Sequence, residues 1–328
     1  MRATGWLTPA FFVYMYLAAD GIRATVIMNA NDYIDGFISY IVAERNYSKL
    51  TAEGYATALN EFLTFIETAY GIKDWADVDA DHIREWVVEL MTGQLPVTVN
   101  KKLSALRSFY KFMLIRGYVT TDPTRKVKGP KGEKHLPVFV RESDMDTLLD
   151  KVEFCEDYEG LRDRLIILLL YSTGMRLAEL VGLNVSSIDF YSSSVKVLGK
   201  RNKERLIPFG AELREALQAY LDVRAQQPQA VDNAALFPGK RGLRITRETV
   251  SSVVKKYLSQ VSTARKLSPH VLRHTFATAM LNNGAEVEVV RQLLGHESIA
   301  TTEVYTHVTF EELKKVYAKA HPRADKKD

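Results

Sequence analysis

The segment Ser268-Pro269-His270-Val271-Leu272-Arg273-His274 has the pattern of a helix start. Serine is a good N-cap, and proline is tolerated in the first helical turn, where its missing N–H would have no partner. His270 and Arg273 are three residues apart, so they share one helix face. The unpaired N–H groups of a first turn favour an anion. The segment therefore predicts a helix that presents a histidine and an arginine toward an anion.

The sequence around this segment predicts a domain at 138–328 that contains both helices and strands. Two short strands are predicted at 195–198 and 205–208, around a turn that contains Lys200. The predicted helices lie at 142–151, 161–172, 176–182, 211–225, 246–260, 269–283, 286–294 and 302–318. The last of them would carry Tyr305 near its start. It would also carry an apolar stripe made by Val308, Phe310, Leu313, Val316 and Tyr317.

The part of the chain before this domain, 29–116, has helical periodicity throughout. Four helices are predicted there, with candidate first residues Asn31 or Asp32, Ser48, Asp79 or Asp81, and Thr98. Residues 28–100 hold four Lys/Arg and twelve Asp/Glu, whereas 101–134 hold ten Lys/Arg and two Asp/Glu. Such a basic stretch can neutralise DNA phosphates although the formal net charge is only +4. A solvated helix face followed by a charged linker explains the pattern equally well.

Residues 122–137 are predicted to be a basic linker between the two domains. Three prolines and two glycines disfavour regular structure there, and five Lys/Arg suit a strap across a phosphate backbone. An ordinary exposed linker is the alternative. The single cysteine, Cys155, allows no intrachain disulfide, which fits a reducing cytoplasm.

Residues 1–27 are predicted to be a dispensable extension. The apolar stretch at 6–19 is interrupted by Pro9 and is shorter than the roughly 20 residues of a membrane-spanning helix. A secretory signal would have a more positive start than Arg2 alone provides. Met28 lies just before a clean helix start, so we expect function to need only the chain from Met28 onward. A membrane anchor is the alternative.

Several motifs in order resemble the tyrosine recombinase, or phage integrase-like, family. The octapeptide T-G-M-R-L-A-E-L at 173–180 is similar to the family's first arginine box, and 270–274 is similar to its H-x-x-R box. Leu294-Gly295-His296 and Tyr305, nine residues further on, match its L-G-H and nucleophile positions. Lys200 lies where the family's hairpin carries a catalytic lysine, although Arg201 stands where relatives often have glycine. Residues 97–107 and 319–324 resemble the Xer-type branch.

The resemblance implies how a phosphate would be bound and attacked. Arg176 and Arg273 would bind the non-bridging oxygens of a DNA phosphate, because arginine binds such oxygens bidentately and stays charged. Tyr305 would be the nucleophile that forms a 3′-phosphotyrosyl bond. His270 would assist proton transfer at this nucleophile.

Three further residues have implied roles in the same site. His296 would donate a hydrogen bond to the phosphate oxygens, and Lys200 would protonate the leaving 5′ oxygen. Glu179 would support the site without acting as an acid. No metal or cofactor is required by this chemistry. Taken alone, each of these residues also has an ordinary explanation, such as packing for Tyr305 or a helix end for His296.

The fold that the resemblance implies is mainly α, in two domains that form a C-shaped clamp around DNA. Residues 28–121 would be a four-helix, SAM-like core-binding domain, in which Lys101, Lys102, Arg107 and Lys111 contact DNA. Residues 138–328 would be an α+β catalytic domain with a small sheet. The helix carrying the apolar stripe would pack into a neighbouring subunit. Packing on its own domain is the alternative.

The function implied is site-specific recombination through a four-way Holliday junction. Four recombinase subunits, of one or two kinds, would act on double-stranded DNA in the cytoplasm. The Xer-type likeness implies resolution of chromosome dimers and activation by a septal DNA translocase. A mobile-element integrase or a DNA invertase with the same chemistry is the alternative. An architectural DNA-binding protein is the non-enzyme alternative, which the complete set of six catalytic positions argues against.

Overall fold

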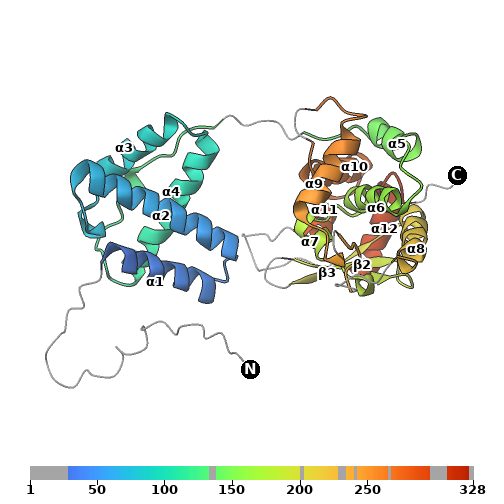
Figure 1. The fold of residues 1–328 in the computed structure, drawn as a ribbon, viewed down its shortest axis with the longest axis horizontal. Helices are drawn as coiled ribbons and strands as arrows, with labels where there is room; N and C mark the ends of the chain where they lie inside the picture. Colours follow the sequence, from blue (N-terminus) through green and yellow to red (C-terminus); the bar gives the residue numbers. More distant parts are fainter. Residues whose placement is uncertain are drawn as a thin grey trace, which may run out of the picture. The chain divides into compact units, whose positions relative to one another are not determined.

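The computed structural model describes residues 29–132, 138–199, 203–227, 234–239, 242–264, 267–295 and 309–324. They form two compact units, divided between Lys134 and His135 (Figure 1). Each unit has a hydrophobic core of its own. The division falls inside the predicted linker. The predictions made for residues 1–27, Lys200, His296 and Tyr305 lie outside the described residues.

The first unit is helical, as predicted. Its elements are α1 (Ala30–Ala43), α2 (Lys49–Tyr70), the 3-10 helix η2 (Trp75–Asp77), α3 (Ala80–Met91), α4 (Pro96–Ile115) and the 3-10 helix η3 (Pro123–Lys126). Ser48 caps α2 and Asp79 caps α3, as predicted. Two starts differ from the prediction. Asn29 caps α1, because its side chain accepts the N–H groups of Asn31 and Asp32. Helix α4 begins at Pro96, where proline suits the first turn.

Aromatic side chains fill the core of the first unit. Phe62 and Phe109 pack against Trp75, a residue that is only 1% exposed. The Trp75 ring N–H donates to the carbonyl of Ala30 over 3.0 Å, and the Tyr110 hydroxyl donates to the carbonyl of Trp75 over 3.0 Å. The polar ends of these buried rings are therefore satisfied, as buried polar groups must be.

The described part of the predicted linker packs on this unit. Asp122 caps η3 by accepting the N–H of Thr124 over 2.9 Å, and both Thr124 and Val127 are buried. The expectation of no regular structure is therefore wrong for η3, which contacts α3 and α4. The physical reason is that Pro123 is the first residue of η3, where proline is tolerated, and that a capping aspartate and two buried side chains stabilise the turn.

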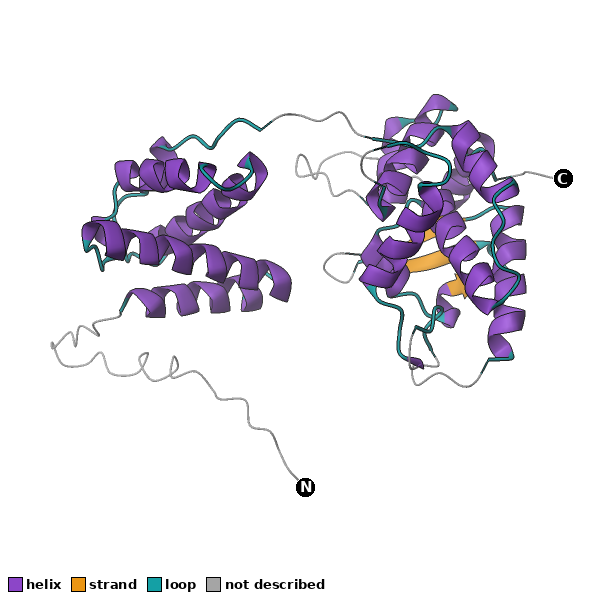
Figure 2. Ribbon diagram, turned by 45° about the horizontal axis from the view of Figure 1, so that its top comes forward, coloured by secondary structure: helices purple, strands orange, loops and turns teal. Residues whose placement is uncertain are grey.

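The second unit combines helices with a small sheet (Figures 1 and 2). The sheet is antiparallel and has three strands in the order β1-β2-β3. Its elements are α5 (Glu142–Asp150), α6 (Tyr158–Thr173), α7 (Leu177–Val181), the 3-10 helix η4 (Val185–Ser187), β1 (Ile188–Asp189), β2 (Ser194–Leu198), β3 (Glu204–Pro208), α8 (Ala211–Ala225), α9 (Arg247–Leu258), α10 (Pro269–Asn282), α11 (Val287–Leu294) and α12 (Phe310–Ala320). The predicted strands are confirmed as β2 and β3. Strand β1 was not predicted, because two residues carry no periodicity.

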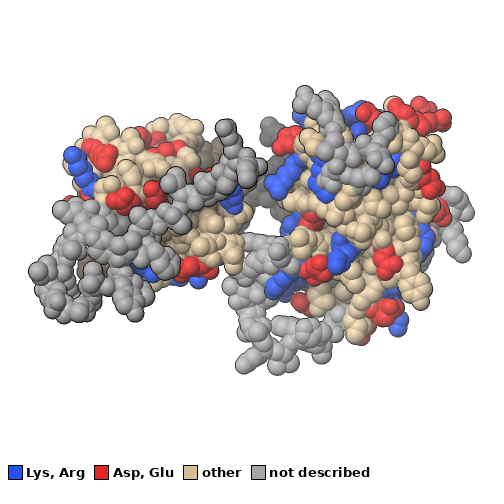
Figure 3. Space-filling model, turned by 60° about the horizontal axis from the view of Figure 1, so that its bottom comes forward, with Lys and Arg blue, Asp and Glu red and all other residues tan. Residues whose placement is uncertain are grey.

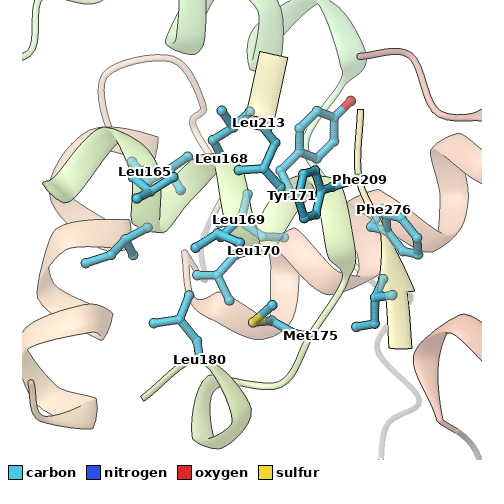
Figure 4. Close-up of a cluster of buried hydrophobic side chains, with 14 of the residues drawn as sticks. Leu165, Leu168, Leu169, Leu170, Tyr171, Met175, Leu180, Phe209, Leu213 and Phe276 are labelled. Carbon is cyan, nitrogen blue, oxygen red and sulfur yellow. The ribbon is translucent and has the colours of Figure 1, made fainter. Parts of the chain in front are cut away.

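Helix α6 lies at the centre of the second unit and is buried along most of its length. Leu168, Leu169 and Leu170 are fully buried, together with Tyr171. Figure 4 shows these side chains among Met175, Leu180, Phe209, Leu213 and Phe276, which come from other elements of the unit. An apolar run of this kind predicts burial on all sides rather than a single apolar face.

The last helix starts later than predicted. We expected a helix at 302–318, whereas α12 begins at Phe310. Thr309 is the N-cap, and it forms a capping box with Glu312. This T-x-x-E signal is visible in the sequence. The apolar stripe that continues through 302–318 outweighed it in the prediction.

The described part of the tail packs on its own unit within the single chain. Tyr317 is 2% exposed and lies in the core, and Leu313 and Val316 pack against that core. Arg323 is 3% exposed and pairs with Glu212 and with two carboxylates of α5. The stripe of α12 is therefore largely covered within one chain.

Candidate active site

Helix α10 carries His270 in its first turn and Arg273 one turn further on. Pro269 is the first residue of the helix, as predicted, and His270 is exposed. Ser268 occupies the N-cap position, but its side chain forms no cap hydrogen bond, contrary to the prediction. Arg273, one turn further on, is only 8% exposed.

The Arg273 guanidinium joins the C-terminal ends of two helices. Nη1 donates to the carbonyl of Gly174, just after α6, over 2.7 Å. Nη2 donates to the carbonyl of Leu294, the last residue of α11, over 2.6 Å. The last carbonyls of a helix have no partner within it and carry partial negative charge, so a cation is favourable there.

Arg176 lies at the start of α7 and is held by Glu179 in the same turn. The backbone N–H of Arg176 donates to one carboxylate oxygen over 2.7 Å, and Nη1 donates to the other over 2.9 Å. Nη2 donates to the carbonyl of Gly295 over 3.0 Å. The side chain remains 37% exposed, so part of the guanidinium is open to a ligand.

Glu179 is shared with a second arginine, Arg205 of β3. Arg205 binds both carboxylate oxygens, over 2.7 and 2.8 Å. Burial alone would raise the pKa of Glu179. The hydrogen bonds from Arg205 and Arg176 outweigh that effect and hold this pKa below its ordinary value. Glu179 is therefore an anion that orients two arginines, and it does not serve as a proton donor at neutral pH.

Three successive carbonyls at the end of α11 accept from three arginines. Those of Leu294 and Gly295 accept from Arg273 and Arg176, and that of Leu293 accepts from Nε of Arg205 over 3.0 Å. Gly295 has a φ of +64°, and a Cβ on it would lie 3.0 Å from Nη1 of Arg205. Both the left-handed backbone and the close guanidinium require glycine here.

The cluster has an excess of positive charge. Three guanidinium groups surround one carboxylate, and burial followed by the nearby charge of Arg176 lowers the pKa of Arg273 to about 10. Arg273 therefore stays protonated at neutral pH. A bound phosphate diester would offset this repulsion, which makes the site suited to a DNA phosphate.

The structure thus brings together Arg176, Arg273 and Glu179, which the sequence analysis named. The hairpin between β2 and β3 closes next to Lys200, through a 2.7 Å hydrogen bond from the Gly199 N–H to the Lys203 carbonyl. Lys200, His296 and Tyr305 themselves lie outside the described residues.

Arg205 was missed in the sequence analysis. In the register of the sheet it pairs with Val197, next to the pair Val195 and Ile207, and all three of those partners are buried. A charged residue at an inward-facing strand position almost always has a buried partner. The alternation of β3 was therefore the signal that could have identified it.

The basic residues of α4 differ in their surroundings. Lys101 and Lys111 are exposed. Lys102, whose side chain is 14% exposed, forms an ion pair with Glu61 of α2. Arg107 donates to the carbonyl of Val127 over 2.8 Å.

Beside Arg107 and Lys111 lies a depression of about 490 Å³, which is also lined by Leu114, Asp122, Thr124 and Arg125. On α4, Lys111 is thus a better candidate for a phosphate contact than Lys102. On the second unit, Asp and Glu gather along the right edge in the view of Figure 3, and Lys and Arg are more frequent on the left.

Two family models match the chain. The model described as the phage integrase family covers residues 139–312, and that of the phage integrase N-terminal SAM-like domain covers residues 34–117. Curated proteins named tyrosine recombinase XerC are similar along almost their whole length. That of Pelotomaculum thermopropionicum is 39% identical over 302 residues, which cover 89% of this chain and 98% of that protein. That of Bacillus subtilis is 34% identical over 308 residues, 92% of this chain and 99% of that protein.

The chain therefore belongs to the phage integrase family of tyrosine recombinases. It is a site-specific recombinase of Xer type, an enzyme that cleaves and rejoins DNA. Among solved structures, a XerH recombinase bound to a palindromic difH substrate, in a post-cleavage complex, matches with a TM-score of 0.67. The match covers 88% of this chain and 82% of that one at 20% identity, which is a likeness of fold. None of the helices in the described ranges has the length and apolarity to cross a membrane.

Proposed function

We propose that the chain cuts each DNA strand through a covalent bond between Tyr305 and a 3′ phosphate. The phenolic oxygen of Tyr305 attacks phosphorus, the bond from phosphorus to the 5′ oxygen breaks, and a free 5′ hydroxyl leaves. The energy of the broken diester stays in the phosphotyrosyl bond, so a second 5′ hydroxyl can attack it and rejoin the strand without a cofactor.

The observation that carries the proposal is the anchoring of Arg176 and Arg273 at one helix end. Their carbonyl acceptors belong to consecutive residues, Leu294 and Gly295, so the two guanidinium groups converge on one place. Attack on phosphorus adds negative charge to the non-bridging oxygens, and fixed positive groups stabilise that charge.

The proton transfers are assigned to histidine and lysine. His270 is exposed on the first turn of α10, one helical turn from Arg273, and accepts or relays the Tyr305 proton. Lys200 protonates the leaving 5′ oxygen, because an alkoxide is a poor leaving group. His296 donates a hydrogen bond to the phosphate. Glu179 keeps Arg176 in place.

The experiment that tests the proposal is covalent trapping on a nicked suicide substrate. The wild-type chain is expected to form a protein–DNA adduct that survives denaturation. Tyr305→Phe is expected to bind the same DNA with unchanged affinity and to form none. Tyr317→Phe is the matched control, because it removes the hydroxyl of a buried tyrosine of α12. An adduct in Tyr305→Phe would show that another residue is the nucleophile.

In the cell, the proposed role is resolution of chromosome dimers in the cytoplasm. A tetramer containing this chain, alone or with a second recombinase, would exchange strands through a Holliday junction, under the control of a septal DNA translocase. The names of the relatives support this role. Recovery and sequencing of the bound DNA from the host genome tests it, since one site per chromosome is expected. Mobile-element ends or inverted repeats would indicate an integrase or an invertase.

The two-domain clamp and exchange of the tail between subunits are further parts of the proposal. The clamp would use 28–121 and 138–328 on opposite faces of the duplex, joined through the remaining part of the 122–137 segment. Exchange of the tail would require Tyr317 and Arg323 to leave the contacts that they make within one chain. Residues 1–27 are proposed to be dispensable, which recombination by a chain that starts at Met28 tests.

A further inference from the structure

We infer that Arg205 is a positioning residue of the cleavage reaction, acting through Glu179 and the end of α11. This inference rests on the proposed function, because it concerns how Arg176 is held for a DNA phosphate. Arg205 is not among the six catalytic positions that the family motifs supply, and it lies on a different element from all of the described ones.

The hydrogen bonds of Arg205 are directed into the protein. All three of its guanidinium nitrogens donate within the chain, Nε to the Leu293 carbonyl and the two Nη atoms to Glu179. Its side chain is 15% exposed, against 37% for Arg176. Arg205 therefore supports the site from behind, whereas Arg176 is open to a ligand.

The contact with Glu179 determines where Arg176 lies. Arg205 forms a two-pronged ion pair with the carboxylate, which fixes the plane of that group. One of the same carboxylate oxygens accepts from Nη1 of Arg176. Rotation of the carboxylate would move the Arg176 guanidinium, because that side chain is tied to the same oxygen. Arg205 thus sets the orientation of Arg176 through one intermediate residue.

The contact with Leu293 gives Arg205 a second route to the site. Leu293 belongs to the last turn of α11, and its neighbours Leu294 and Gly295 hold Arg273 and Arg176. The Gly295 backbone leaves room for the Arg205 side chain, which lies 3.0 to 3.2 Å from a Cβ placed there. Arg205 therefore fixes the helix end from which the chain continues to His296 and Tyr305.

The variant Arg205→Lys tests whether the charge of Arg205 is sufficient or its geometry is also needed. Arg205→Lys keeps the positive charge beside Glu179, but one ammonium group cannot reproduce the planar fork to two carboxylate oxygens and the Leu293 carbonyl. Loss of positioning in a site of this kind costs about 10- to 100-fold in rate, since misplacement by about 1 Å can cost 100-fold. We expect that loss in the single-turnover cleavage rate at saturating DNA, with DNA affinity within about threefold of wild type.

A neutral substrate distinguishes positioning from general loss of structure. A methylphosphonate at the scissile position lacks one negative charge, so its cleavage depends less on the arginines. The deficit of Arg205→Lys is expected to shrink about tenfold on this substrate. A merely structural defect lowers the active fraction and slows both substrates equally.

Arg214→Lys is the matched control. Arg214 lies on α8 and donates to the Ser193 hydroxyl over 2.6 Å and to the Phe190 carbonyl, away from the arginine cluster. Its replacement is expected to lower thermal stability without changing the ratio of the two cleavage rates. Arg205→Gln is measured in parallel, so the conclusion does not depend on one variant that folds poorly.

The experiment distinguishes failure of the positioning role from failure of the proposed function. If the wild-type chain forms no covalent adduct with its DNA site, both the proposed function and the positioning role are wrong. If the wild type cleaves and Arg205→Lys cleaves at the same rate, only the positioning role is wrong. An equal deficit on the phosphodiester and the methylphosphonate also overturns it. A deficit that shrinks on the neutral substrate supports it.

Discussion

Replacement of Gly210 by alanine tests whether the C-terminal tail is seated on its own chain. Gly210 precedes α8 and has an ordinary extended backbone, with φ −90° and ψ −176°, which alanine adopts without strain. A Cβ at this position would lie 2.0 Å from the carbonyl oxygen of Ala324 and 2.6 Å from its carbonyl carbon. Both contacts are backbone atoms, so no side-chain rotation relieves the clash. The tail has to move.

The size of the effect follows from what that movement breaks. The Ala211 N–H donates to the Ala324 carbonyl over 3.1 Å, and its loss costs about 1 kcal/mol. Overpacking at a tight site adds about 1–3 kcal/mol. We therefore expect the catalytic unit to lose about 2–4 kcal/mol of its free energy of unfolding. For a unit of this size, that lowers its Tm by roughly 5–15 °C.

Calorimetry on the full chain measures this effect, because the two units are expected to give separate transitions. The control is the same replacement in a chain that ends at Arg323, which lacks Ala324. Any N-cap preference of glycine over alanine acts in both chains and cancels. The cost is expected to fall below about 1 kcal/mol in the shorter chain. An equal cost in both chains, or no cost in the full chain, would show that the tail does not occupy this place.

Two other predictions concern pH and DNA binding. Burial lowers the pKa of His321 from 6.5 to about 4, so the unfolded chain binds more protons than the folded chain between these values. Through this group, the free energy of unfolding of the catalytic unit should therefore fall by roughly 2 kcal/mol from pH 7 to pH 5. His321→Gln should remove this pH dependence, which urea titrations at several pH values measure. On α4, Lys111→Ala should weaken DNA binding and lower the salt dependence of the DNA affinity by the equivalent of about one phosphate contact. Lys102→Ala should leave both nearly unchanged, because Lys102 is paired with Glu61. Equal losses in the two lysine variants would contradict this assignment.

The sequence predicted elements well where local signals and burial agree. Ser48 and Asp79 are strong caps, and the strands at β2 and β3 alternate clearly, so their positions were confirmed within one or two residues. The errors occurred where a long-range contact decided the outcome. The segment after Asp122 was expected to be irregular, but Thr124 and Val127 are buried against other helices. Their burial depends on α3 and α4, which no local pattern around Pro123 reveals.

The residues of the candidate site could be predicted from motifs, but the contacts between them could not. Spacing placed His270 and Arg273 on one helix face, and the motifs named Arg176 and Glu179. Nothing in the spacing shows that Arg273 reaches a carbonyl 21 residues later, or that Arg205 reaches Glu179 across 26 residues. Every residue has a backbone carbonyl, so a sequence does not show which carbonyls accept hydrogen bonds. The binding of the arginines to the end of α11 is therefore visible only in the structure.

The anchoring of the arginines explains how the site can be ready before DNA arrives. A guanidinium has five N–H groups. Among the described residues, Arg176 uses one N–H of each Nη atom, for Glu179 and for the Gly295 carbonyl. Arg273 uses one N–H of each Nη atom for the carbonyls of Gly174 and Leu294. Three N–H groups on each arginine therefore remain for a phosphate, without loss of the bonds that hold the side chain. Donors that are already fixed need no reorganisation when charge develops on phosphorus, and this is the main source of stabilisation at such a site. The three carbonyls at the end of α11, which have no partner within the helix, thus hold the arginines of a cationic phosphate site.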